Sequence, residues 1–187
     1  MLQKLKPANY RAAITMACLL FSSLPLWAAI DLFLNIPNIP GESQAPGFVN
    51  QIELSGFSES IANPVAIIPS GVSNGPAVLG NIVITKNLDA TSTPLYLACA
   101  QGTMLQNPVV LTVQKAGTTP VVIYTLSLTN VYVKSVASSA SGGGSLPAET
   151  VTLTCGQIQW SYVPILPNGS AGTPIVHSWN AQNGTGN

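Results

Sequence analysis

One short pattern in the chain could carry covalent chemistry. The run Gly71-Val72-Ser73-Asn74-Gly75 matches G-x-S-x-G, in which a tight strand-to-helix turn presents a nucleophilic serine. No helical pattern follows it, and the single histidine, His177, lies in a Pro- and Gly-rich segment without a carboxylate near it in the sequence to orient its ring. A serine hydrolase is therefore disfavoured.

The other reactive side chains are too few to predict a site. One histidine and two exported cysteines cannot complete a tetrahedral zinc site. Glu42 and Glu53 could form the acid pair of a glycosidase, but solvated charges on strand edges are the favoured interpretation. We therefore predict that the protein is not an enzyme and binds no metal or cofactor.

The first 29 residues have the form of a secretory signal peptide. Lys4, Lys6 and Arg11 make a basic region ahead of the apolar run 12–27. That run is about 16 residues long, shorter than the roughly 20 that a membrane-spanning helix needs.

Cleavage is expected near Ala28 or Ala29, since signal peptidase requires small side chains there. A retained membrane anchor and a lipoprotein anchor at Cys18 are the two alternatives, and both fit the residues less well. The mature protein is then secreted or periplasmic, and its length suits one domain.

The exported part carries few charges. Charged residues are 6% of the whole chain, against roughly 25% in ordinary soluble domains, and hydrophobic residues are 47%. The exported part keeps three lysines and six carboxylates, a formal net charge of −3: Lys86, Lys115 and Lys134 against Asp31, Glu42, Glu53, Glu59, Asp89 and Glu149. Without a basic patch, neither nucleic acid nor an anionic membrane is an expected partner. A surface with so few charges favours association with other protein surfaces.

Cys99 and Cys155 are the only cysteines that remain after cleavage. Export delivers them to an oxidising compartment, so a disulfide between Cys99 and Cys155 is the default expectation.

Alternation of apolar and polar residues predicts a mainly β protein. The expected strands cover residues 30–36, 48–57, 81–86, 109–115, 121–136 and 149–163. Ser92 and Pro94 predict the start of one short helix that continues to about Gln101 and ends at Gly102. This set of elements favours a small barrel or sandwich.

Two segments are rich in residues that interrupt regular structure. Residues 58–80 predict one long loop with a short extended piece at 65–68, because prolines and glycines recur through it. Residues 165–187 predict an irregular Gly-, Asn- and Ser-rich tail with a disordered end.

Five segments in order resemble the Hcp family, whose members form six-membered rings that stack into the inner tube of type VI secretion systems. They are 31–43 with its Gly-Glu-Ser turn, 52–58, 86–95 with its Lys, Asp and Ser-Thr-Pro pattern, 124–133, and 149–153 with 158–162. The resemblance covers residues 30–164, nearly all of the predicted fold.

The resemblance implies a small antiparallel β-barrel of about six to eight strands with one short α-helix. It also implies a structural subunit whose partners are copies of itself, with a secreted effector or a spike protein as further candidates. Family members that serve as the inner tube are loaded from the cytoplasm and normally carry no cleaved signal peptide. A ring or filament outside the cell is therefore expected for this chain.

The candidate contact residues between subunits are apolar or aromatic. Val65, Ile67 and Ile68 lie in the long loop, which in the resembled family contributes to ring stacking. Trp160 and Tyr162 share one face of the last long strand, and Trp179 is the one tryptophan of the tail. The alternative is a monomeric secreted binding module or effector that uses its loops or aromatic residues to hold a sugar or a host protein.

Overall fold

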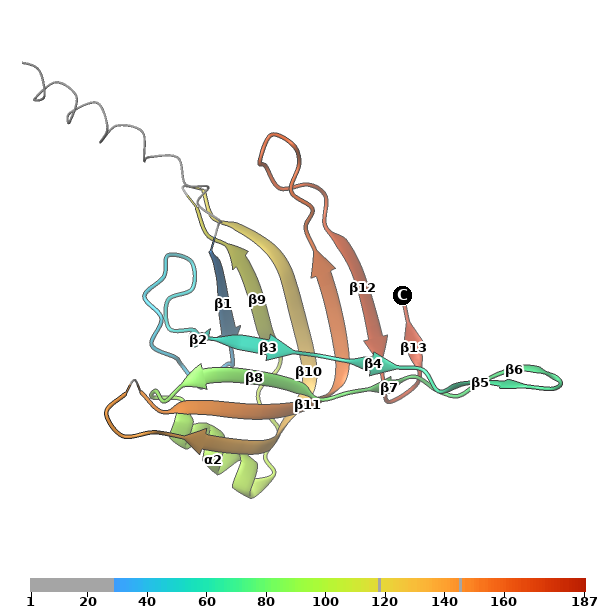
Figure 1. The fold of residues 1–187 in the computed structure, drawn as a ribbon, viewed down its shortest axis with the longest axis horizontal. Coiled ribbons are helices and arrows are strands. Elements are labelled where there is room, and N and C mark those ends of the chain that lie inside the picture. Colours follow the sequence, from blue (N-terminus) through green and yellow to red (C-terminus); the bar gives the residue numbers. More distant parts are fainter. Residues whose placement is uncertain (1–28, 118, 145) are drawn as a thin grey trace, which may run out of the picture.

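The protein is mainly β with one short helix (Figure 1). The computed structural model describes residues 29–117, 119–144 and 146–187. The predicted signal peptide, residues 1–29, lies outside the described residues except for Ala29. Among the described residues, no helix is long and apolar enough to cross a membrane.

Strand β1 (Ile30–Asn35) confirms the first predicted strand and lies between β2 (Ile52–Leu54) and β9 (Val109–Lys115). Both pairings are antiparallel, and Leu34 lies opposite Ile52 on one side and Leu111 on the other. These three side chains are fully buried, so the alternation seen in the sequence corresponds to one face turned to the core.

Two long strands dominate the sheet. β10 (Val121–Ser139) and β11 (Ala148–Tyr162) form one antiparallel hairpin, which confirms both predicted strands with small shifts of their ends. Asn130 has φ +55°, and a Cβ added at Gly156 on the facing strand would lie 3.2 Å from its Cβ. The buried positions of β10 are even-numbered before Asn130 (Leu126 and Leu128) and odd-numbered after it (Val131 and Val133), so the hairpin bends here and both halves face the core.

The predicted helix is confirmed as α2 (Ser92–Gln101), which packs against β10. Thr91 is its N-cap residue, one position before the predicted Ser92, and its side chain makes no capping hydrogen bond. The Ser92 hydroxyl belongs to a buried polar network. Gly102 ends the helix with φ 60°, a left-handed conformation that glycine adopts without strain.

The predicted β-barrel is not closed in the structure. One edge of β11 pairs with β8 (Ile82–Asn87) along 148–153 and with β12 (Ile175–Asn180) along 157–162. The sheet therefore divides at β11 instead of continuing to a single closing partner. The predicted strand 48–57 is also divided. Its first part, β2, pairs with β1, whereas β3 (Gly56–Ser58) pairs with β8. The result is a strongly curved sheet wrapped around one core (Figure 1).

The tail is not irregular as predicted. β12 adds to the edge of β11, and β13 (Thr185–Gly186) pairs with β12. Its polar composition suggested a loop, but an unpaired edge of β11 supplies backbone partners that any sequence without proline can use.

The long loop 58–80 also contains paired strands. β4 (Ile61–Ala62) pairs with β7 (Val78–Leu79), and β5 (Val65–Ile68) pairs with β6 (Gly71–Asn74). Together they form a narrow two-stranded extension, residues 61–79, which we call the arm; it projects away from the body of the protein (Figure 1). The extended piece predicted at 65–68 is confirmed as β5.

Candidate assembly surface and its polar anchors

The arm presents apolar side chains that nothing in the described chain covers. Val65, Ile67 and Ile68, predicted as contact residues, are 55%, 89% and 44% exposed. Val72, on the paired strand, is 67% exposed and was missed by sequence reasoning, which had no signal that residues 71–74 form a strand. Four β-branched side chains on one exposed hairpin are typical of a surface that binds another protein.

Two glycines, one in the arm and one at its base, allow the outgoing and returning chains to come close together. A Cβ at Gly80 would lie 3.0 Å from the carbonyl oxygen of Ser60, and a Cβ at Gly75 would lie 2.7 Å from Cγ of Pro64. Gly80 N also donates to that Ser60 carbonyl over 2.8 Å. The glycines that suggested a loop therefore serve close strand packing.

Of the three predicted aromatic contact residues, two are half-buried. Trp160 and Trp179 pack against the core, and Trp179 lies opposite Ile158 in the pairing of β12 with β11. Tyr162 is 50% exposed at the end of β11. The structure therefore gives Trp160 and Trp179 contacts within the chain and leaves Tyr162 available at the surface.

Glu59 holds the base of the arm against the sheet. Its Oε1 accepts from the Tyr124 hydroxyl over 2.5 Å, and its Oε2 accepts from Trp160 Nε1 over 3.0 Å. Sequence reasoning missed Glu59 as a functional residue. Its position two residues after Phe57, at the same phase of the strand alternation, was the available signal.

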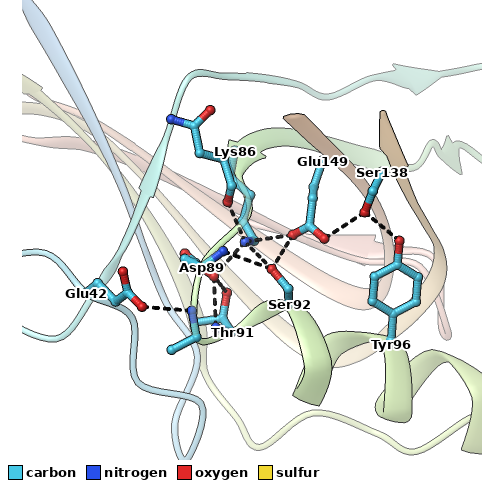
Figure 2. A network of polar contacts seen from close by, with 10 residues as sticks. Glu42, Lys86, Asp89, Thr91, Ser92, Tyr96, Ser138 and Glu149 are labelled. Carbon is cyan, nitrogen blue, oxygen red and sulfur yellow. Dashed lines mark hydrogen bonds and ion pairs between the residues drawn. The ribbon is translucent and has the colours of Figure 1, made fainter. Parts of the chain in front are cut away.

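A buried ion pair joins the helix to the sheet. The Lys86 Nζ lies 2.8 Å from Glu149 Oε2 and 2.6 Å from Asp89 Oδ1, and the Lys86 and Glu149 side chains are fully buried. Figure 2 shows the Lys86 ammonium group between these two carboxylates, with Ser92 beside them. Lys86 and Asp89 were recognised as part of a family pattern, but the pairing of Lys86 with Glu149 was not predicted.

Hydroxyl groups complete this network. Ser92 Oγ donates to Glu149 Oε2 over 2.6 Å, and Ser138 Oγ donates to Glu149 Oε1 over 2.9 Å. Ser138 is in turn 2.7 Å from the Tyr96 hydroxyl (Figure 2). Both carboxylate oxygens of Glu149 thus have donors, which is the condition under which a buried charge is tolerated.

The predicted disulfide is not formed in the structure, where Cys99 and Cys155 are both free thiols. Cys99 lies on α2, which packs against β10, whereas Cys155 lies on β11 opposite Val131. Burial, reinforced by the negative charge of Glu59, raises the pKa of the Cys155 thiol to about 11.

The residues weighed for catalysis have other positions. Ser73 lies in β6 opposite Ala66, and β7 follows it, so the strand-to-helix turn of a nucleophile elbow is not formed there. His177 lies on β12 with Nδ1 3.0 Å from the Asn187 carbonyl oxygen. Glu42 and Glu53 line one shallow groove, where Glu42 Oε1 accepts from the backbone N–H of Ala90 over 3.0 Å. Within the described residues, no group of His, Cys, Asp and Glu is arranged to hold a metal ion.

Comparison with known proteins assigns this curved sheet, with its one helix and long extension, to a family of secretion proteins. The family model "Type VI secretion system effector, Hcp" matches residues 33–162. Protein hcp1 of Pseudomonas aeruginosa is 30% identical over 155 residues, which cover 81% of this chain and 95% of that protein. The chain therefore belongs to the Hcp family of type VI secretion.

Solved structures share this fold. A structure described as that of a type six secretion system protein superimposes with a TM-score of 0.80 at 26% identity, covering 85% of this chain and all of that one. Hcp1 from Salmonella typhimurium gives a TM-score of 0.69 at 24% identity, covering 85% and 99% of the two chains. This second likeness supports the fold.

Proposed function

We propose that this protein is a non-enzymatic structural subunit that assembles with copies of itself into a ring, hexameric as in the resembled family, and that the rings stack. The observation that carries this proposal is the arm with its exposed apolar residues, on a chain that belongs to the Hcp family. An arm of one subunit that reaches a different surface of the next makes a heterologous contact, which produces rings or open filaments.

The projection of the arm beyond the body supports stacking rather than closure of the ring. Ile67 and Val72 lie near the tip of the hairpin, which extends beyond the body (Figure 1). A projecting element of this kind suits contact with a neighbouring ring, and removing about four β-branched side chains from water would stabilise that contact by several kcal/mol.

Export of the mature chain is part of the proposal. A signal peptide over residues 1–29, cleaved near Ala28 or Ala29, would place the assembly in the periplasm or outside the cell. A secreted effector or a spike protein would then be a partner of the ring. Intact mass of the protein recovered from the periplasm or the medium tests this, because a mass that includes residues 1–28 would contradict cleavage.

The size of the particle tests assembly. We expect light scattering on the chain beginning at residue 30 to give a multiple of the subunit mass, and negative-stain microscopy to show rings and stacked rings. A particle with the mass of one chain at all concentrations would contradict the proposal.

A monomeric binding module is the second candidate. It is favoured by a groove of about 400 Å³ on β10–β12, lined by hydroxyl and carboxamide side chains that include Ser127, Gln157 and Gln159. Trp179 also lines it, and its buried Nε1 has no hydrogen-bond partner among the described residues. A single-chain particle that binds a neutral sugar at this groove would support this candidate instead.

A further inference from the structure

Glu59 connects the arm to two strands of the body. It lies between β3 and β4, where the chain leaves the sheet and enters the arm. Each of its carboxylate oxygens accepts one hydrogen bond, from Tyr124 on β10 and from Trp160 on β11. The side chain therefore spans two neighbouring strands that are far from it in sequence.

Phe57 makes a second contact with the same tyrosine. The ring centroids of Phe57 and Tyr124 lie 6.5 Å apart, with an angle of 21° between the ring planes. Residues two apart on an extended chain face the same side, so Phe57 and Glu59 lie against the sheet together. The outgoing strand is thus held by an aromatic contact followed by two hydrogen bonds.

The chemistry of the two donors suits a carboxylate. An indole N–H can only donate, and a carboxylate offers two acceptor oxygens. Hydrogen bonds to a charged acceptor are also stronger than those between neutral groups. Burial, the hydrogen bond to Glu59 and its charge raise the pKa of Tyr124, so the phenol remains a donor throughout the neutral range.

Beyond its base, the arm has few attachments. β4 pairs with β7 and β5 with β6, and every residue of β4, β5 and β6 is exposed. On the returning strand Leu79 packs against the core. The direction in which the arm leaves the body is therefore set at its base, by Leu79 on one strand and by Glu59 on the other.

We infer that Glu59 is a positioning residue for assembly, which holds the arm in the orientation that reaches the next ring. This inference rests on the proposed function for the role of the arm, and on the contacts of Glu59 for the orientation. Loss of the carboxylate leaves the apolar tip intact but lets the arm sample many directions. Because only a fraction of the arms then has the orientation needed for contact with the next ring, the apparent affinity of stacking falls.

The test compares Glu59→Ala with Glu53→Ala, which removes the same charge from an exposed position on β2. Hydrogen–deuterium exchange of peptides from 58–80 reports the order of the arm, and light scattering reports the ring and its stacking. We expect Glu59→Ala to keep the ring, to speed exchange about tenfold and to raise the protein concentration needed for stacking about tenfold. The Glu53→Ala variant should match the wild type in both measurements.

If Glu59→Ala does not fold, Glu59→Gln replaces it in the test. The exchange rate of residues 58–80 should then lie between that of the wild type and that of an arm without the Glu59 hydrogen bonds. A second pair of variants separates this contact from general destabilisation. In the Tyr124→Phe background, which lacks one of the two donors, Glu59→Ala should have a smaller effect on exchange than in the wild type.

Equal effects in the two backgrounds, or unchanged exchange in the Glu59 variant, would overturn the inference. If wild-type rings form but do not stack, the stacking part of the proposed function fails. The exchange measurement on the rings still decides whether Glu59 orders the arm.

Discussion

Lys86 and Glu149 form an ion pair 2.8 Å long in which both side chains are fully withdrawn from water. Lys86 lies on β8 and Glu149 on the paired strand β11, directly opposite each other. Because Ser92 of α2 contacts both charged groups, the pair also fixes the helix on the sheet.

Removal of one partner of this pair should be costly. Glu149→Ala leaves Lys86 buried with Asp89 as its remaining carboxylate, and we expect the free energy of unfolding to fall by about 3 kcal/mol. Urea denaturation followed by circular dichroism measures this. Exposed Glu53→Ala should change it by less than about 0.5 kcal/mol, and a similar loss in the two variants would contradict a special role for the pair.

Stability should depend on pH through Glu149. Burial alone would raise the pKa of its carboxyl, but hydrogen bonds from Lys86, Ser92 and Ser138 and the Lys86 charge outweigh burial and lower it below 4.5. The unfolded chain therefore takes up a proton first as pH falls. The stabilisation is fully present above pH 4.5 and is lost as pH falls through the lower folded-state pKa.

Urea denaturation of wild type and Glu149→Gln across that range checks this pH dependence. The gap in unfolding free energy between the two should shrink as the solution is acidified. A gap independent of pH would argue against an ionised Glu149 in the folded protein.

Both cysteines should remain free thiols in protein purified without reductant. We expect two free thiols per mature chain by intact mass after alkylation in denaturant, since Cys99 and Cys155 are unpaired. In the folded protein Cys155, with a pKa of about 11, should be alkylated slowly at pH 8 because only about one thiol in a thousand is ionised.

Substitution of Glu59 by Gln should speed that alkylation, because Glu59 contributes to the raised pKa through its charge. Recovery of an oxidised protein lacking both thiols would instead support a disulfide.

Charge on the tip of the arm should abolish stacking without unfolding the subunit. Ile67→Asp with Ile68→Asp places two carboxylates where the side chains are 89% and 44% exposed, so the melting temperature should change by no more than a few degrees. Stacked rings should disappear in electron micrographs while single rings persist. Ser70→Asp, in the turn of the same hairpin, is the matched control and should stack; loss of stacking in this control would indicate that any added charge interferes.

Local patterns in the sequence predicted much of the fold. Alternation located β1, β9, β10 and β11, and the glycine at 102 marked the end of α2, since these signals depend on residues close in the chain. The ordered set of motifs also indicated the Hcp family, which the match over residues 33–162 confirms.

Features that join distant segments were decided only by the tertiary structure. β12 exists because half of one edge of β11 has no other partner, and the arm is paired because its two strands leave the sheet side by side. The same is true of Lys86 with Glu149 and of Glu59 with Tyr124 and Trp160. A sequence shows which side chains could pair. Whether a thiol, a charge or a strand edge finds a partner depends on burial and distance, and these arise only when the sheet has folded around its core.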